Sequence, residues 1–225
     1  MSSEKLETTH TASTQLKKQE GTYQDIYFNY GAKYDLRDRF YRPTSGHTIE
    51  FNQSIPVYSD NYELTNTFEV NKYHALNRTS DIIAKISFYT QAVNSINGGD
   101  SRISKRLFIP AKRLRGFEPG KVGPKDNAEY IGGNYVTTLN IASGLPNFIP
   151  SFENIDLSAF FDAANIWGVD YSNSVKESNT IRSSAGLSID LITPVGPLNF
   201  AFSQPITKAS TDKTESFRFN LGTTF

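Results

Sequence analysis

The amino-acid sequence predicts an all-β fold, an antiparallel β-barrel that spans a membrane with its apolar face toward lipid. Three observations lead to this prediction. Apolar and polar residues alternate in nine segments, several of these segments are long, and the connections between them fall into short and long ones. A period of two is typical of strands, because successive side chains point to opposite faces.

The alternation places residues of different chemistry on the two faces of each segment. In the first segment Ile26, Phe28 and Tyr34 share one face, whereas Asp25 and Lys33 lie on the other. No segment shows a convincing helical period. The nine predicted strands cover residues 25–37, 48–57, 62–70, 81–88, 135–141, 155–163, 184–191, 198–203 and 217–225.

Alternation alone does not separate a membrane barrel from a soluble, ligand-binding β-sandwich, whose apolar face turns inward. Strand length favours the barrel, because several segments exceed the usual five or six residues and reach the roughly nine to eleven that cross a bilayer. Tyr and Phe often fall near strand ends, as interfacial girdles require. Short connections at one end and mostly long ones at the other are also typical of outer-membrane barrels.

Composition excludes several kinds of site. Lys+Arg and Asp+Glu both total 23, so no overall field attracts nucleic acid, and no nucleic-acid partner is expected. The basic run of Arg102, Lys105, Arg106, Lys112 and Arg113 is interpreted as the solvated flank of a loop. The absence of cysteine excludes disulfides, thiolate metal sites and cysteine nucleophiles.

The sequence predicts no catalytic centre, no metal and no cofactor. The three histidines lack metal-binding spacing, and no G-x-S-x-G elbow occurs. Asp35, Arg37 and Asp38 are expected to form charge pairs at a strand end rather than a catalytic cluster. The protein is therefore not expected to be an enzyme, with an outer-membrane lipase as a minor alternative.

Several short motifs occur in a defined order along the chain. They are YDLRD and PTSG near the start, LRGF at 114–117, IGGN at 131–134, FFDAANIW at 160–167, TPVGPLNFAFSQP at 193–205 and FNLGTTF at the end. Together they resemble the BamA family of outer-membrane barrels, within the bacterial surface antigen superfamily. The resemblance runs from about residue 23 to residue 225 and implies an antiparallel transmembrane barrel.

The resemblance implies a functional loop. In this superfamily the arginine of the loop motif folds back inside the barrel and pairs with the carboxylate of an F-x-D-x-G strand motif. Here these positions are Arg115 for the loop, and Phe160, Asp162 and Ala164 for the strand motif. Alternation independently places Asp162 on the polar, inward face. An arginine fork can bind a carboxylate at two points and stays charged in a secluded site.

The loop motif LRGF comprises Leu114, Arg115, Gly116 and Phe117. Gly116 is expected to let the backbone turn sharply, and Phe117 to pack against the wall. The chain departs from the family pattern twice. Ala164 replaces the usual glycine, so the packing of the loop tip is expected to differ. Asn140 stands in a strand where relatives often carry a glutamate, which leaves Arg115 one charged partner unless another group compensates.

The resemblance also implies a function, that of a factor which inserts and folds β-barrel proteins into the outer membrane of a Gram-negative bacterium. An incoming strand would pair with an edge exposed at a lateral seam, and backbone hydrogen bonds tolerate many client sequences. Phe219, Gly222 and Phe225 would form the seam and the C-terminal signal. A two-partner secretion pore, or a TamA-like translocation pore of the same superfamily, is the alternative.

The expected partners are unfolded outer-membrane β-barrel clients, outer-membrane lipids and assembly-complex lipoproteins bound through periplasmic domains. Nine strands are fewer than the sixteen of the family's barrel, and unpaired edges cannot face lipid. We therefore interpret residues 22–225 as the C-terminal portion of a barrel, with its long loop at 97–130. Residues 1–21 are expected to be a polar extracellular loop or disordered segment. On this interpretation we expect the early strands, the periplasmic repeats and the export signal of the complete protein to lie outside the given sequence.

Overall fold

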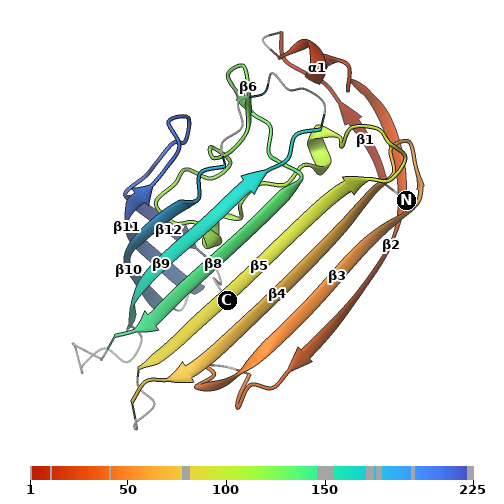
Figure 1. The fold of residues 1–225 in the computed structure, drawn as a ribbon. Coiled ribbons are helices and arrows are strands. Elements are labelled where there is room, and N and C mark those ends of the chain that lie inside the picture. The colour runs from red at the N-terminus through yellow and green to blue at the C-terminus, as the bar shows by residue number, and fades with distance from the viewer. Residues whose placement is uncertain are drawn as a thin grey trace.

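A single antiparallel sheet dominates the computed structural model. The structure describes residues 2–10, 12–40, 42–77, 82–145, 155–170, 175, 179–193 and 196–221. The sheet has ten strands in the order β1-β2-β3-β4-β5-β8-β9-β10-β11-β12 (Figure 1). Its strands are β1 (Ser2–Leu6), β2 (Gly21–Asp35), β3 (Ser45–Ser59), β4 (Glu63–Ala75), β5 (Ile83–Ser95), β8 (Tyr135–Gly144), β9 (Ile155–Trp167), β10 (Arg182–Thr193), β11 (Gly196–Thr207) and β12 (Phe217–Leu221).

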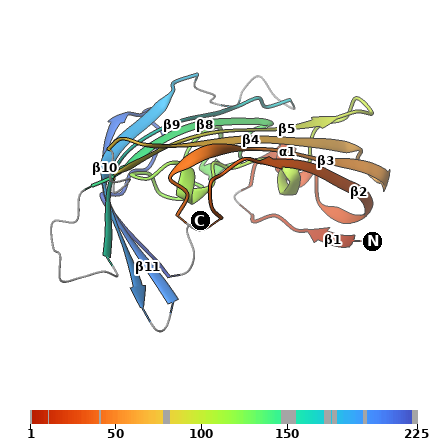
Figure 2. The ribbon, with the colours of Figure 1, turned by 90° about the horizontal axis from the view of Figure 1, so that it is seen from below.

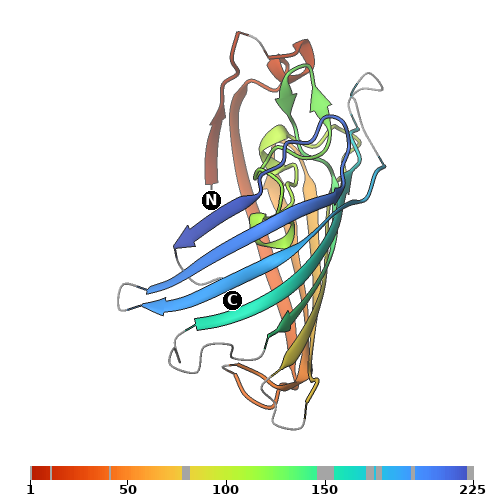
Figure 3. The ribbon, with the colours of Figure 1, turned by 90° about the vertical axis from the view of Figure 1, so that its left-hand side faces the viewer.

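The sheet is curved, and its concave side holds the long connection between β5 and β8 (Figures 2 and 3). We call this connection, residues 96–134, the inner loop. It contains two 3-10 turns, η1 (Ile103–Lys105) and η2 (Ala111–Arg113), and a small hairpin of β6 (Lys125–Asp126) and β7 (Glu129–Tyr130). The sheet is open, with β1 and β12 as its edge strands.

All nine predicted strands are confirmed, as β2 to β5 and β8 to β12, while residues 222–225 of the last predicted strand lie outside the described residues. Several of them are longer than the alternation indicates. Strand β5 continues to Ser95 and β9 to Trp167. The additional residues include Val93 and Ile166, which are apolar although they face inward, so the alternation fails there. Both side chains are fully buried beneath the inner loop.

Residues 1–21 differ from the predicted loop or disordered segment. Residues Ser2–Leu6 form β1, which pairs with β2 from Gly21 to Asp25. A short helix, α1 (Thr14–Lys17), is capped by Ser13, whose hydroxyl accepts a hydrogen bond from the Leu16 N–H at 3.2 Å. The expectation was wrong because β1 carries almost no apolar side chains. Backbone bonds to the edge of β2 form this strand, and they leave no pattern in the sequence.

The apolar face of the sheet points outward. Phe28 is 57% exposed and Phe219 is 50% exposed, whereas the inward Thr138 and Ser184 are buried. Among the described residues the only other sheet is the β6–β7 hairpin inside the inner loop, so no second sheet covers the apolar face. A β-sandwich would bury these side chains. The sheet is therefore the wall of a transmembrane β-barrel.

The connections are sorted as predicted. Strands β2, β4 and β8 all finish at the same end of the sheet, the lower end in Figure 1. The inner loop, α1 and the β11–β12 connection lie at the other end. Within the described part of the chain, no helix combines the length and apolarity that a membrane-spanning helix needs.

Two neighbouring residues in the middle of β3 test the assignment of the faces. Phe51 pairs with Phe68 of β4 on the outer face. Asn52 lies on the inner face, where its amide donates to Glu50 at 2.8 Å. We expect Phe51→Lys to lower the free energy of unfolding in lipid vesicles by about 2–4 kcal/mol, because the ammonium would face hydrocarbon.

The matched variant Asn52→Lys should stay within about 1 kcal/mol of wild type, since its ammonium can pair with Glu50. Urea titration of the vesicle-embedded protein measures both variants. Equal losses for the two would contradict the assignment of the faces.

Candidate functional site

The inner loop packs on an apolar patch of the concave wall. The patch consists of inward side chains of β5, β8 and β9, where alternation predicts polar residues. The loop meets it with apolar side chains of its own, and the cluster as a whole is buried. Its members are Leu107, Ile109, Leu114, Phe117 and Val122 from the loop, and Tyr89, Val93, Val136, Ala164 and Ile166 from the wall. The loop is therefore held against the wall by burial of apolar surface as well as by charge.

Arg115 and Asp162 form the pair that the resemblance implied. Arg115 Nε donates to Asp162 Oδ2 at 2.7 Å, and Arg115 Nη2 donates to Oδ1 at 2.7 Å. The backbone N–H of Arg115 adds a third hydrogen bond, to Oδ2 at 3.1 Å. The guanidinium lies over the ring of Phe160, with Cζ 3.4 Å from the ring centroid. Asp162 is fully buried, so this two-point contact fixes both the position and the orientation of the loop tip.

Asn140 stands at the position where the resemblance implied a glutamate. Its Nδ2 donates to Asp162 Oδ1 at 2.8 Å and to the carbonyl oxygen of Arg113 at 2.7 Å. The amide thus gives Asp162 a further donor and also binds the loop backbone. A second carboxylate at this position would instead repel Asp162, and a further cation of the loop would be needed to neutralise it. Asn140 therefore supports the contact between Arg115 and Asp162 by a hydrogen bond rather than by a second ion pair.

Gly116 makes the sharp turn at the loop tip, with φ of +88°. A Cβ there would lie 3.1 Å from Ser184 Cβ and 3.2 Å from Ser203 Cβ, so the backbone rests directly on β10 and β11. Phe117, 1% exposed, is buried in the apolar cluster as predicted, and its carbonyl oxygen accepts a hydrogen bond from Arg218 of β12. The tip therefore touches every strand from β9 to β12.

The basic run does not form a solvated flank, and that interpretation was wrong for three of its residues. Arg102, Arg106 and Arg113 are buried, while Lys112 is exposed. Arg113 Nη2, for example, donates to Glu69 of β4 at 2.6 Å. The reason is the position of the loop: it lies inside the curve of the sheet, where carboxylates of the wall oppose its arginines.

Arg106 pairs with Asp170, which follows β9. Asp170 also accepts hydrogen bonds from the Ser101 N–H at 3.0 Å and from Asn134 Nδ2 at 2.9 Å. Burial alone would raise the pKa of the Asp170 carboxyl. The hydrogen bonds and the Arg106 guanidinium outweigh it and hold the pKa below its ordinary value, so the carboxylate stays charged.

Sequence reasoning missed two further charge groups around the inner loop. Arg182 of β10 donates to Asp212 Oδ2 at 2.9 Å, and the Gly123 N–H of the loop donates to Asp212 Oδ1 at 3.2 Å. The second group is Arg102 with Asp25 and Glu63. The available signal was that Asp25 and Glu63 occupy inward positions at the same end of their strands.

The C-terminal residues are described only in part. Phe219 lies on the outer face of the edge strand β12, with its ring centroid 5.2 Å from that of Phe200 in β11. Gly222 and Phe225, the other residues assigned to the seam and signal, lie outside the described residues. The role of all three stays a prediction.

A polar cavity of about 470 Å³ lies beneath the inner loop on the concave side. Its lining includes Lys85, Glu69 and Asn199, together with Arg113 and Arg115 of the loop. Among the described residues no three His, Cys, Asp or Glu side chains gather closely enough to hold a metal ion. The predicted charge pair at the end of β2 is present, with Arg37 Nη2 2.6 Å from Asp35 Oδ2.

The sheet combines an outward apolar face with a polar concave face, and buried charge pairs bind a long loop to the concave face. These features define the class of transmembrane β-barrels with an inwardly docked loop. Residues 2–225 match the model of the Omp85 superfamily domain. The chain belongs to the Omp85 superfamily.

Three known proteins are similar to this chain in sequence, in line with this assignment. The chain is 30% identical over 141 residues to the outer membrane protein assembly factor BamA of Neisseria meningitidis serogroup B, covering 50% of this chain and 17% of that protein. It is 23% identical over 194 residues to BamA of Neorickettsia risticii, covering 84% and 26%. A SAM50-like protein of Schizosaccharomyces pombe is 24% identical over 231 residues, covering 96% and 48%.

Among solved structures, the crystal structure of Haemophilus ducreyi BamA lacking POTRA domains 1–3 matches with a TM-score of 0.78 and 25% identity. The match covers 88% of this chain and 42% of that one. The chain thus spans less than half the length of each of these proteins. The resemblance to the BamA barrel and the predicted fold class are confirmed.

Removing the charge of Asp162 tests the central contact. Asp162→Asn leaves the Arg115 guanidinium without its anion in a mostly buried site. We expect the free energy of unfolding in vesicles, measured by urea titration, to fall by roughly 3–5 kcal/mol. Asp156→Asn is the control on the same strand, because Asp156 pairs with Arg42 in an exposed contact worth at most about 1 kcal/mol. The importance of the buried pair is refuted if the two variants lose the same stability.

Gly116→Ala tests the close approach of the loop tip to the wall. The substitution should lower the free energy of unfolding by about 1–2 kcal/mol, because alanine disfavours this backbone conformation. Crowding of Ser184 and Ser203 by the added Cβ should lower it by about 1–3 kcal/mol more. Gly120→Ala is a matched control, because its φ is +69° and nothing lies within 4 Å of an added Cβ. Thermal unfolding should show a clearly larger loss for Gly116→Ala. Similar losses would mean that the tip does not press on β10 and β11.

Proposed function

We propose that this chain is the barrel portion of an outer-membrane protein assembly factor, which inserts and folds β-barrel proteins into the membrane through a lateral seam. The observation that carries the proposal is the inner loop docked by Arg115 and Asp162 inside a sheet that resembles the BamA barrel. The names of the two bacterial relatives support it, since both are outer membrane protein assembly factors.

The proposed mechanism is strand addition at an edge. The edge strand β12 pairs with β11 on one side, and its other side offers backbone N–H and C=O groups. In a bilayer each unpaired backbone group costs several kcal/mol, so an incoming client strand that pairs there is strongly stabilised. Such pairing uses backbone N–H and C=O groups, which all clients share, so it tolerates many client sequences. No bond is made or broken in the client, so we propose that the protein is not an enzyme.

The inner loop supports the edge at which clients would bind. Arg218 of β12 donates to the carbonyl oxygens of Ala111 and Phe117, on both sides of the Arg115 anchor. The Glu215 N–H, just before β12, donates to the Gly116 carbonyl at 3.1 Å. Because the same tip is fixed to β9 by Arg115, the edge strand is held in register with the rest of the wall while its free side accepts a client.

The proposed partners follow from the two faces. The outer apolar face contacts outer-membrane lipid, and unfolded β-barrel clients meet the edge strand. Lipoproteins of an assembly complex would bind through periplasmic domains, and nucleic acid has no part in the function. We propose that the protein acts in the outer membrane of a Gram-negative bacterium, and the names of the two bacterial relatives support this.

A TamA-like or two-partner secretion pore of the same superfamily would share the wall and the docked loop. The cargo separates the possibilities: an assembly factor yields membrane-embedded clients, and a secretion pore yields soluble cargo on the far side. Vesicles that hold the complete protein should therefore convert several different barrel clients to folded forms without passing a soluble secreted protein.

Arg115→Ala tests the proposed role of the loop. In phospholipid vesicles the complete protein with this substitution should fold barrel clients at an initial rate about tenfold below wild type, equivalent to about 1.4 kcal/mol. The measurement is the appearance of protease-resistant client. Arg37→Ala is the control, because Arg37 pairs with Asp35 at the far end of β2. An unchanged rate for a correctly folded Arg115→Ala protein would contradict the proposed function of the loop.

A further inference from the structure

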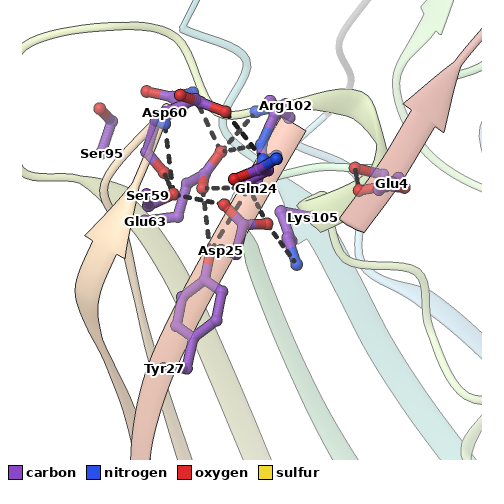
Figure 4. A network of polar contacts seen from close by, with 12 residues as sticks. Glu4, Gln24, Asp25, Tyr27, Ser59, Asp60, Glu63, Ser95, Arg102 and Lys105 are labelled. Atoms are coloured by element: carbon purple, nitrogen blue, oxygen red, sulfur yellow. Dashed lines mark hydrogen bonds and ion pairs between the residues drawn. The ribbon is translucent and has the colours of Figure 1, made fainter. Parts of the chain in front are cut away.

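A second charge cluster holds the inner loop at its beginning (Figure 4). Arg102 Nη2 donates to Asp25 Oδ2 of β2 at 2.7 Å and to Glu63 Oε2 of β4 at 3.1 Å. Arg102 Nε and the Arg102 backbone N–H both donate to Glu63 Oε1, at 3.2 and 3.1 Å. The side chains of Arg102, Asp25 and Glu63 are exposed by 2%, 0% and 1%.

Neighbouring groups complete the hydrogen bonding of the two carboxylates. Ser59 Oγ donates to Asp25 Oδ1 at 2.6 Å, and Asn61 Nδ2 donates to Glu63 Oε1 at 3.0 Å. Lys105 Nζ lies 3.6 Å from Asp25 Oδ2 and supplies the second positive charge. Two carboxylates are thus balanced by two cations, both of which come from the inner loop. The wall alone would leave two buried negative charges close together, which is costly.

The charge state of the cluster is stable. Burial alone would lower the pKa of the Arg102 guanidinium, but the hydrogen bonds to Glu63 and Asp25 outweigh it and raise the pKa. The Arg102 guanidinium also lies over the Tyr23 ring, with Cζ 4.6 Å from the ring centroid. A planar cation with several donors fits this site, and a lysine could not make all of these contacts at once.

We propose that Arg102 is a second positioning residue of the inner loop, which fixes its beginning to β2 and β4 while Arg115 fixes its tip to β9. The two anchors lie on different parts of the curved sheet. From β2 to β9 the strand order makes five steps, about 24 Å along the sheet at about 4.8 Å a step. The loop therefore ties the first strands of the wall to the last ones across the concave side.

Two anchors make the docking of the loop cooperative. When one anchor opens, the other keeps the released segment close to its site, which raises its effective concentration there. Arg106 and Arg113 add further contacts between the anchors. The consequence for client insertion rests on the proposed function; the docking itself does not.

Hydrogen exchange of the complete protein in lipid nanodiscs tests the second anchor. Arg102→Met alone leaves two buried carboxylates and can prevent folding, so the main variant combines Arg102→Met with Asp25→Asn and Glu63→Gln, which removes all three charges. We expect amides of residues 101–109 to exchange at least tenfold faster, while β3, β4 and β5 stay within about threefold of wild type. Arg115→Ala should instead affect residues 113–118.

Two controls separate positioning from general stabilisation. Lys112→Met removes an exposed cation of the same loop that takes no part in the cluster, and it should leave exchange of residues 101–109 within about threefold of wild type. Arg102→Lys, with the wild-type carboxylates, keeps the charge without the fork and should fall between wild type and the triple variant. Wild-type exchange in the triple variant would overturn the second anchor, as would an equal loss of protection in β3, β4 and the loop.

Combining the triple variant with Arg115→Ala should expose the whole of residues 101–118, with exchange faster than in either parent. The vesicle assay of client folding distinguishes this inference from the proposed function. Faster loop exchange with an unchanged folding rate would support the anchor and contradict the proposed role of the loop in assembly. Unchanged loop exchange would overturn the anchor whatever the folding rate.

Discussion

The structure depends on the match between arginines of the inner loop and carboxylates of the wall. Arg102, Arg113 and Arg115 reach Asp25, Glu63, Glu69 and Asp162, which belong to strands separated along the sheet. Removing one member of such a buried pair leaves an uncompensated charge at a cost of roughly 3–5 kcal/mol. The wall and the loop are therefore incomplete without each other, and the loop belongs to the barrel interior although it begins and ends at the rim.

Apolar packing and charge pairing make different contributions to this docking. The cluster around Leu114, Phe117, Val136 and Ile166 stabilises contact between the loop and the wall, but burial of apolar surface is not directional. The bidentate pair of Arg115 and Asp162 is directional and selects one position of the tip. The same two contributions explain the order of residues in LRGF. Leu114 is buried, Arg115 binds the carboxylate of Asp162, and Gly116 lets the backbone reverse direction, all within one short segment.

The sequence was sufficient for the wall but not for everything that the wall encloses. Alternation located nine strands, because lipid on one face and polar surroundings on the other force a period of two. The resemblance located Arg115 and Asp162. Strand β1 left no pattern, since backbone pairing alone forms it, and the apolar inward residues of β5 and β9 broke the alternation where the loop covers them. Burial of Arg102 and Arg106 could not be predicted, because a basic run reads the same whether it faces water or buried carboxylates.

The contacts of Arg218 connect this interior network to the edge of the sheet. A guanidinium on β12 that binds the Ala111 and Phe117 carbonyls uses backbone acceptors of the loop, and these acceptors are presented correctly only when the tip is docked. Undocking the tip would remove these two hydrogen bonds and leave Arg218 its ion pair with Glu215, which lies three residues earlier on the same segment. Such a local pair cannot hold the strand against β9 or β10. The position of the edge strand is therefore set from inside the barrel, by the loop, as well as by its ladder with β11.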